Sequence, residues 1–463
     1  MSQHVLLFDF GSTYTKVMAV DLAAEAVLGW AQSPSTVDSD IARGATEALA
    51  ALEREVGLDL AAVERRLACS SAAGGLRIVA SGLVRQLTAE AARSAALGAG
   101  GKLVGTYAQS LSAAELCEIE TTAPDIVLLA GGTDGGNEAV IRANAATLAA
   151  SGLTAPIIVA GNKSAQDEVA ACLRAAGKEV HVTENVMPEL GVANVVPARE
   201  VIRQIFIDRI VVAKGLAEAE ALVGAVLMPT PLAVSDGARL LAEGTAGEPG
   251  LGELVVVDIG GATTDVHSLA EGRPRGRVVL KGLAAPFCQR TVEGDMGMRI
   301  SAAGVLEAKA EAPASGGPGL DAEPAAAYVA RLTRETAHLP HSEAERQIEH
   351  EIARTAVAVA CARHAGRLTA HYLPGGETAY TQLGKDLTEI ATVVGTGGIF
   401  GHVRDPGAIL RAATFDEAEP FSLRPKSPRC LADGRYLLFG AGLLATVAPD
   451  EALRLLKRHL TAV

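Results

Sequence analysis

The chain has 463 residues, which corresponds to about three structural units at roughly 150 residues per domain. It has 41 Lys and Arg against 54 Asp and Glu, and the net charge of −13 disfavours a protein that grips a nucleic-acid backbone. A composition of 49% apolar and 21% charged residues is typical of a globular protein and excludes a disordered one.

The six cysteines lie far apart in the sequence, and no two of them form a CxxC pair. A zinc ribbon or a dithiol redox motif is therefore excluded, and we expect reduced thiols. The N-terminus lacks the basic segment of a secretion signal, and no apolar run reaches the roughly 18 residues that a membrane span needs. These features predict a cytoplasmic protein that does not contact a membrane.

The first half of the chain begins with a β-hairpin pattern, with apolar runs at 5–10 and 16–20 around a glycine-containing turn. A helix is expected at 39–55 because its apolar residues recur on one face. Strands and helices then alternate, which predicts βαβ units and a parallel sheet covered on both faces. The expected strands are 125–130, 156–160 and 180–183, and the expected helices are 138–150, 165–176 and 200–222.

The second half of the chain starts with the same hairpin pattern, at 254–258 and 265–269. Pro and Gly are frequent at 309–326, which predicts a flexible surface insertion. A long helix is expected from the capping residue Ser342 to about residue 367. A strand at 390–394 and a C-terminal helix at 449–460 complete the expected elements.

Each hairpin carries an acid at the end of its first strand, followed after one residue by glycine and then by hydroxyl side chains. Glycine lets backbone N–H groups approach an anion, hydroxyls add donors, and the acid can hold a hydrated cation against phosphates. One such turn is a weak signal, whereas two copies behind two strands are a stronger one. The two copies are Asp9, Gly11, Ser12, Thr13, Tyr14, Thr15 and Asp258, Gly260, Gly261, Ala262, Thr263, Thr264, Asp265.

A third glycine-rich turn follows the expected strand at 390–394, with Gly395, Gly397 and Gly398. Glycines at such a junction can accept a purine and its sugar against the backbone. Taken alone, the turn is better explained as a tight connection with no ligand.

In this order, the three turns resemble those of the actin, sugar-kinase and heat-shock-chaperone ATPase superfamily. The resemblance implies an α/β, actin-like ATPase fold with two lobes and a nucleotide cleft between them, and it implies ATP and Mg²⁺ as cofactors. Lobe I is expected at 1–245, with the helix at 449–460 returning to it. Lobe II is expected at 246–448, with the insertion at 309–326.

The resemblance also implies roles for the turn residues. Asp9 and Asp258 are expected to hold magnesium, and Asp258 and Asp265 are the catalytic candidates that position the metal or the attacking water. Ala262 departs from the third glycine of the heat-shock chaperones. The expected ATP-binding residues are Gly11, Ser12, Thr13, Tyr14, Lys16, Gly260, Gly261, Thr263, Thr264, Gly395, Gly397 and Gly398, although a strand-edge lysine such as Lys16 is more often solvated.

Four phrases resemble one branch, the accessory proteins of methylaspartate (glutamate) mutase, a MutL-like family unrelated to mismatch repair. The resemblance implies an ATP-driven reactivating chaperone that frees an adenosylcobalamin-dependent mutase, such as glutamate mutase, from damaged cobalamin. A homodimer is also possible. The phrases are LLAGGTDGGN at 128–137, VAGNK at 159–163, TENVMP at 183–188 and TVEGDMGMR at 291–299.

Several alternatives stay open at this stage. Gly131–Gly136 is either a second ligand loop at the carboxyl end of a strand or a structural turn. Asp295 either approaches the cleft or caps a helix. The main rival function is a small-molecule kinase of the same fold, in which Asp134 is the candidate catalytic acid, and a filament-forming ATPase is a further one. Iron–sulphur activators share the fold, but the spacing of the cysteines argues against that class.

Overall fold

The computed structural model describes residues 4–36, 41–71, 76–208, 226–311, 322–374 and 377–463. The chain divides into two compact units. Unit 1 consists of Met1–Gly74, Val211–Val279 and Arg290–Val463, and unit 2 consists of Gly75–Ile210 and Leu280–Gln289. Among the described helices, none combines the length and the apolar character needed to cross a bilayer.

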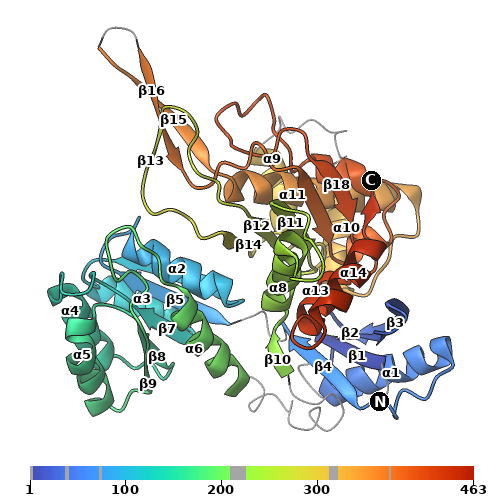
Figure 1. Cartoon of the computed structure of the whole chain (residues 1–463), viewed down its shortest axis with the longest axis horizontal. Helices are drawn as coiled ribbons and strands as arrows, with labels where there is room; N and C mark the ends of the chain where they lie inside the picture. The colour runs from blue at the N-terminus through green and yellow to red at the C-terminus, as the bar shows by residue number, and fades with distance from the viewer. Residues whose placement is uncertain (1–3, 37–40, 72–75, 209–225, 312–321, 375–376) are drawn as a thin grey trace. The chain divides into compact units, whose positions relative to one another are not determined.

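The first sheet of unit 1 is built around the expected N-terminal hairpin (Figure 1). β1 pairs antiparallel with β2 on one side and parallel with β4 on the other. In spatial order the strands are β3 (Ala26–Pro34), β2 (Tyr14–Asp21), β1 (His4–Phe10), β4 (Arg65–Ser70) and β10 (Val226–Pro229). The expected helix at 39–55 is confirmed as α1 (Ile41–Val56), which buries Leu49 and Leu52.

The second sheet is built in the same way around the second hairpin. β11 pairs antiparallel with β12 and parallel with β17, which pairs parallel with β18. In spatial order the strands are β14 (Cys288–Glu293), β12 (Thr264–Leu269), β11 (Leu254–Ile259), β17 (Thr392–Thr396), β18 (Arg429–Ala432) and β19 (Thr461–Ala462).

The two sheets therefore share one strand order. Numbered by their place in the chain, the strands of each sheet run 3-2-1-4-5, and β19 adds an edge strand to the second. The repeated order confirms the α/β class and the duplicated, two-lobed actin-like architecture. The lobe boundaries at 245 and 448 stay predictions, because the two compact units divide the chain differently.

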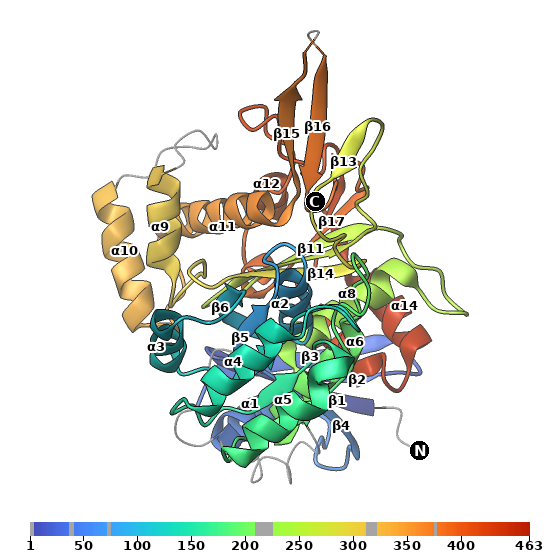
Figure 2. The same cartoon turned by 90° about the vertical axis from the view of Figure 1, so that its left-hand side faces the viewer.

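Helices bury the outer face of the second sheet. Ile352 and Val357 of α11 (Glu343–His364) lie in one core with Val257 and Val393. Ser342 caps α11 as expected, and its hydroxyl accepts a hydrogen bond from the Glu345 N–H. The segment expected as an insertion differs from the prediction at both ends, where α9 (Ala302–Glu311) ends and α10 (Ala322–Arg334) begins; residues 312–321 lie outside the described residues. A hairpin of β15 (Arg367–Tyr372) and β16 (Thr378–Leu383), with β13 (Val278–Leu280) beside β16, projects from this part of unit 1 (Figure 2).

Two helices cross where the sheets of unit 1 are joined. α8 (Thr230–Glu243) follows β10 of the first sheet and packs on β12 of the second. α13 (Leu438–Leu444) follows β18 of the second sheet and packs on β1 and β4 of the first. Each sheet thus contributes a helix that contacts the other sheet.

The crossing is close because both helices carry glycine at the contact. A Cβ added to Gly442 would lie 1.9 Å from the Ala233 carbonyl oxygen, and one added to Gly237 would lie 2.2 Å from the Leu438 carbonyl oxygen. The C-terminal helix α14 (Pro449–His459) packs on this pair and reaches the β2–β3 turn, where Arg454 donates to Glu25 at 2.6 Å.

Gly442→Ala should destabilise unit 1, because the new methyl group forces the two helices apart. We expect the free energy of unfolding to fall by about 1–3 kcal/mol, the usual cost of overpacking. Gly398→Ala is the matched control, since an added Cβ there meets nothing within 4 Å. Equal urea midpoints for the two variants would contradict the close crossing.

Unit 2 contains the parallel sheet expected from the alternating pattern. In spatial order its strands are β6 (Lys102–Ala108), β5 (Arg77–Gly82), β7 (Ile126–Leu129), β8 (Ile157–Val159) and β9 (Val180–Val182), and every pair is parallel. α3 (Ala113–Thr122), α4 (Ala139–Ala149) and α5 (Lys163–Ala175) bury one face in a common core. α2 (Thr88–Gly98) and α6 (Val196–Phe206) pack together on the other (Figure 1). The order 2-1-3-4-5 is that of a doubly wound α/β sheet. The predicted helix at 200–222 overlaps α6 and then runs out of the described residues.

Candidate functional site

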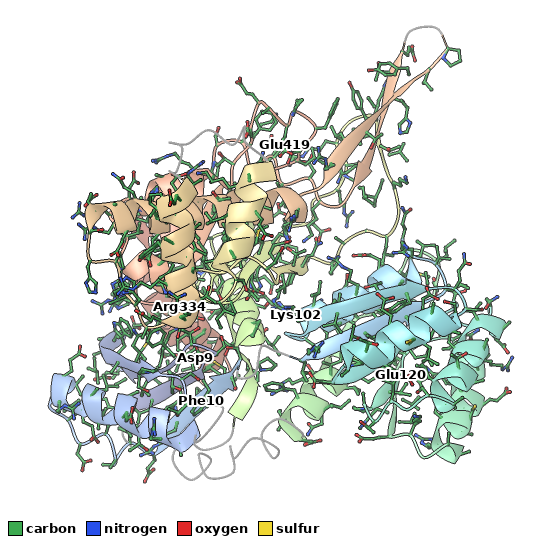
Figure 3. The ribbon with its side chains drawn as sticks, turned by 180° about the vertical axis from the view of Figure 1, so that it is seen from behind. Asp9, Phe10, Lys102, Glu120, Arg334 and Glu419 are labelled. Carbon is green, nitrogen blue, oxygen red and sulfur yellow. The ribbon has the colours of Figure 1, made fainter. Side chains whose placement is uncertain are left out.

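The first candidate turn closes the β1–β2 hairpin. Asp9 pairs with Lys16 in the register of the two strands, and the Gly11 N–H donates to the Tyr14 carbonyl at 3.0 Å. A Cβ on Gly11 would lie 2.6 Å from that carbonyl oxygen, so this tight turn requires glycine. Asp9 lies at the carboxyl end of β1 beside Phe10 (Figure 3).

The second turn repeats the geometry of the first. Asp258 pairs with Asp265 in the β11–β12 register, and the Gly260 N–H donates to the Thr263 carbonyl at 2.9 Å. In both turns, therefore, the glycine after the acid-bearing strand bonds the residue three positions on. Gly261 and Ala262 form the tip of the second turn.

The tips of the two turns are in contact. A Cβ on Gly261 would lie 2.6 Å from the Thr13 hydroxyl oxygen, so a larger residue at 261 would require the Thr13 side chain to move. The Thr13 hydroxyl oxygen is buried and has no hydrogen-bond partner among the described residues. Two segments that are almost 250 residues apart in the chain thus present their backbone and hydroxyl groups to one place in unit 1.

The 291–299 phrase singled out in the sequence holds the second turn in position. Backbone N–H groups of Met298 and Arg299 donate to the carbonyls of Gly260 at 3.0 Å and Gly261 at 2.8 Å. A Cβ on Gly297 would lie 2.5 Å from the Gly261 carbonyl oxygen. Because the carbonyls of Gly260 and Gly261 are hydrogen-bonded to this segment, the backbone conformation of the turn is fixed.

Asp9 is almost fully buried, with 1% of its surface exposed, and it has three neighbours of different chemistry. The Thr230 hydroxyl donates to Oδ1 at 2.6 Å, and the Cys69 thiol lies 3.7 Å from the same oxygen. The Lys16 ammonium lies 3.6 Å from Oδ2. Lys16 is only 19% exposed, so it is not the solvated strand-edge lysine of the usual kind.

Asp258 lies in an excess of negative charge. Burial and then the neighbouring Asp265 carboxylate raise its pKa from 3.8 to about 7, against the opposing effect of Lys16. Asp9, from the first sheet, and Asp433 raise the pKa of Asp258 further. Carboxyl groups from both sheets therefore raise the negative potential at Asp258, and a negative potential attracts a cation.

Asp265 is engaged by neighbours on both carboxylate oxygens. Arg290 donates to Oδ1 at 2.7 Å from Nε and 2.5 Å from Nη2, and the Thr263 hydroxyl donates to Oδ2 at 3.1 Å. The structure thus places Asp265 behind the second turn, where it fixes the orientation of the Thr263 side chain.

The third glycine turn lies beside the second hairpin, because β17 neighbours β11 and Thr396 is in register with Asp258. Gly397 has φ of 111°, and an added Cβ would lie 2.3 Å from the Ile259 carbonyl oxygen. Gly395 is buried against Phe400 at 2.4 Å by the same measure. Packing explains these two glycines, and Gly398 is the member of the set with open space around it.

Sequence reasoning missed Thr230, Thr396, Asp433 and Tyr436. Asp433 follows β18, and its carboxylate accepts from the Thr396 hydroxyl at 2.9 Å and from the Leu437 N–H at 2.9 Å. Asp433 and Gly434 follow a strand, as the acid and glycine of the hairpins do, but without the hydroxyl residues of those turns. This weaker pattern could have pointed to Asp433. No local signal marks Thr230 or Tyr436.

Magnesium is usually held by one or two carboxylates together with phosphate oxygens and water. Over the described ranges, His, Cys, Asp and Glu side chains form no group of three that could hold a metal by itself. Asp9 and Asp258 supply two carboxylates, the number that a magnesium site of this type uses.

The Gly131–Gly136 loop of unit 2 has a structural explanation. Asn162 accepts from the Gly135 N–H at 3.0 Å and donates to the Gly136 carbonyl at 3.2 Å. Asn185 donates to Asp134 at 2.9 Å and to the Gly132 carbonyl at 3.0 Å. The phrases at 128–137, 159–163 and 183–188 thus hold one another in place at the carboxyl ends of β7, β8 and β9.

Comparisons with known proteins agree along the whole chain. A family model described as MutL protein matches residues 5–460. Protein MutL from Clostridium tetanomorphum is 47% identical over 462 residues, and the match covers 99% of each chain.

Solved structures give only weak likenesses. A nucleotide-free acetone carboxylase has a TM-score of 0.40 at 10% identity, covering 95% of this chain and 70% of that one. The xylulose kinase of Bifidobacterium adolescentis has a TM-score of 0.33 at 12% identity, covering 98% and 93%. TM-scores this low support no argument about this chain.

Proposed function

This chain belongs to the MutL protein family, and we propose that it binds and hydrolyses ATP with Mg²⁺ in order to remodel an adenosylcobalamin-dependent mutase. The observation that supports the nucleotide site best is the contact of Gly261 with Thr13 at the tips of two acid-bearing turns. Such a pair of turns offers backbone N–H groups and hydroxyls from two sides, as a polyphosphate requires.

The residues present fit the nucleotide and its metal. Within the part of the chain that the structure describes, the buried Thr13 hydroxyl has no partner, and it could donate to a phosphate oxygen. Asp258, whose pKa is raised to about 7, becomes more stable as a carboxylate when a cation is beside it. When bound, Mg²⁺ would neutralise charge on the phosphates, and Asp9 and Asp258 would hold it.

The remaining groups have separate tasks in this proposal. Lys16 places a positive charge next to the phosphates, and the two turns supply backbone donors. Asp258 accepts a proton from the attacking water or orients it, and Asp265, held by Arg290, fixes Thr263. Catalysis of this type is mostly positioning and electrostatics. The adenosine would lie along the turn after β17, where Gly398 leaves open space and Gly395 and Gly397 shape the backbone.

Hydrolysis can move the protein because each half of the site belongs to a different sheet. ATP contacts both turns through its phosphates, whereas ADP has one phosphate fewer to hold them together. The difference in contact free energy biases the crossing of α8 and α13, and the relative rotation of the two sheets is the output. Slow turnover suits such a switch.

The client follows from the family resemblance, which implies a reactivating factor for glutamate (methylaspartate) mutase. The test is to inactivate that mutase with hydroxocobalamin and to add this protein, Mg²⁺-ATP and fresh adenosylcobalamin. We expect activity to return only when all three are present. If ATP is hydrolysed but mutase activity does not return, the ATPase assignment stands and the assignment of this mutase as the client is wrong.

A small-molecule kinase of the same fold is the alternative, and one assay separates the two. A kinase consumes ATP in proportion to an added acceptor, whereas the proposed ATPase releases inorganic phosphate with none present. The rival's candidate acid, Asp134, already accepts hydrogen bonds from the Asn185 side chain and the Lys163 N–H of the two neighbouring loops.

A further inference from the structure

Tyr436 lies against the nucleotide site, although nothing in the sequence patterns marks it. It follows β18 of the second sheet and immediately precedes the turn that begins α13. Its ring lies under the Lys16 ammonium, which is 3.6 Å from the ring centroid. Lys16 belongs to β2 of the first sheet, so this contact joins the two halves of the site.

The surroundings of Tyr436 are those of the site itself. Burial raises the pKa of its hydroxyl well above the usual value, and the carboxylates of Asp258 and Asp9 raise it further. The neutral phenol thus lies among the acids that the first and second turns bring together, and its ring face is turned to the cation that faces Asp9.

The backbone of Tyr436 is held in an unusual conformation. Its φ is 54°, in the left-handed region that few side chains other than glycine and asparagine adopt. Asp433 maintains this conformation, because the Tyr436 N–H donates to its carbonyl at 3.3 Å and the Asp433 carboxylate caps the following helix. Strain of this kind persists where the surrounding structure fixes it, and it is frequent at functional sites.

We propose that Tyr436 is a positioning residue of the nucleotide site, whose ring face holds the Lys16 ammonium at the point where the phosphates of ATP would bind. Asp9 attracts Lys16 from one side and the ring supports it from the other, with 3.6 Å to each. A lysine whose only partner was Asp9 could adopt several side-chain conformations. The contact with the ring face restricts the Lys16 ammonium to one position. The ring also ties Lys16 to the start of α13, so the position of the cation depends on the crossing of the helices. The part of the proposal that concerns phosphates rests on the proposed function.

The first test needs no nucleotide. Reductive methylation of the free protein, followed by mass spectrometry, gives the rate at which Lys16 is modified relative to exposed lysines such as Lys163. Tyr436→Leu keeps a side chain with the same backbone strain but removes the ring, and Tyr436→Phe keeps the ring. We expect about fivefold faster modification of Lys16 in Tyr436→Leu and an unchanged rate in Tyr436→Phe, since a partly buried cation–π contact is worth roughly 1 kcal/mol. Equal rates in all three proteins would overturn the proposal.

The second test asks whether the ring matters to the ligand. Titration with Mg²⁺-ATP should give a dissociation constant several-fold higher for Tyr436→Leu than for the unchanged protein, with Tyr436→Phe restoring it, while kcat changes less than KM. A merely structural role would instead lower the melting temperature of both variants and leave this split absent. If none of the proteins binds Mg²⁺-ATP but the methylation rates differ as expected, the nucleotide function fails and the role of Tyr436 in holding Lys16 stands.

Discussion

Asp9→Ala and Asp258→Ala should each abolish ATP hydrolysis, with a loss of at least about 10²–10³-fold in kcat, the usual cost of removing a group that stabilises transition-state charge. The two acids come from equivalent positions of the duplicated hairpins, and each contributes one carboxylate to the proposed metal site. Because one acid cannot replace the other across the two sheets, the single variants should be as inactive as the double variant.

The measurement is phosphate release at saturating Mg²⁺-ATP, with folding checked by thermal unfolding. Asp9→Asn and Asp258→Asn preserve the side-chain volume and separate loss of charge from loss of packing. Asp416→Ala is the control, because that half-buried residue's carboxylate accepts from the Ala418 N–H in a local turn. Hydrolysis at more than a tenth of the normal rate in either Asp9→Ala or Asp258→Ala would remove that residue from the metal site.

The two hairpins could be predicted because all their determinants are local. At the end of an apolar strand, an acid, a glycine and hydroxyl residues lie within eight positions, and the return strand follows at once. The contact between the turn tips could not be derived in this way. It depends on Gly261 meeting Thr13, and these residues lie on hairpins of two different sheets whose packing no local sequence pattern encodes.

Two of the four residues that sequence reasoning missed share a topological origin. Thr230 and Asp433 follow the last parallel strand of their sheets, β10 and β18. Each reaches the site because the carboxyl ends of neighbouring parallel strands meet at one edge. The strands themselves have four residues each, too few to show a periodic pattern. Nothing short of the sheet topology could have placed these side chains beside Asp9 and Thr396.

Unit 2 was only half visible in the sequence. The segments from β7 to β9 alternate short apolar strands with helical segments, whereas β5 ends in small residues, Ala80, Ser81 and Gly82. Small residues give a weak hydrophobic signal, so the sequence of such a strand does not show that its neighbours bury it. The glycine-rich phrases in this unit, which could be taken for a ligand loop, are explained by the hydrogen bonds of Asn162 and Asn185.

Binding of Mg²⁺-ATP near neutral pH should release protons, because Asp258 changes its ionisation when a cation arrives. In the free protein, burial and the Asp265 charge raise the pKa of Asp258 to about 7, so the carboxyl is about half protonated at pH 7. A cation beside it favours the carboxylate and lowers that pKa. Calorimetric titrations in buffers of different ionisation enthalpy should therefore show a release of about half a proton at pH 7 from this group, falling towards zero above pH 8.

The same shift makes the stability of the free protein depend on pH. The pKa of Asp258 is 3.8 in an unperturbed side chain and about 7 when folded, so the folded state binds the proton more tightly between these values. The stabilisation is complete below about pH 4 and is lost as the pH rises through 7. Asp258→Asn cannot ionise and should melt at a higher temperature than the unchanged protein at pH 8, with a smaller difference at pH 5. If the asparagine variant is inactive and yet more stable at pH 8, the charge of Asp258 destabilises the free protein and is needed for activity. Equal pH dependence of the two melting temperatures would mean that Asp258 is ionised in the free protein, and no proton release should then be seen.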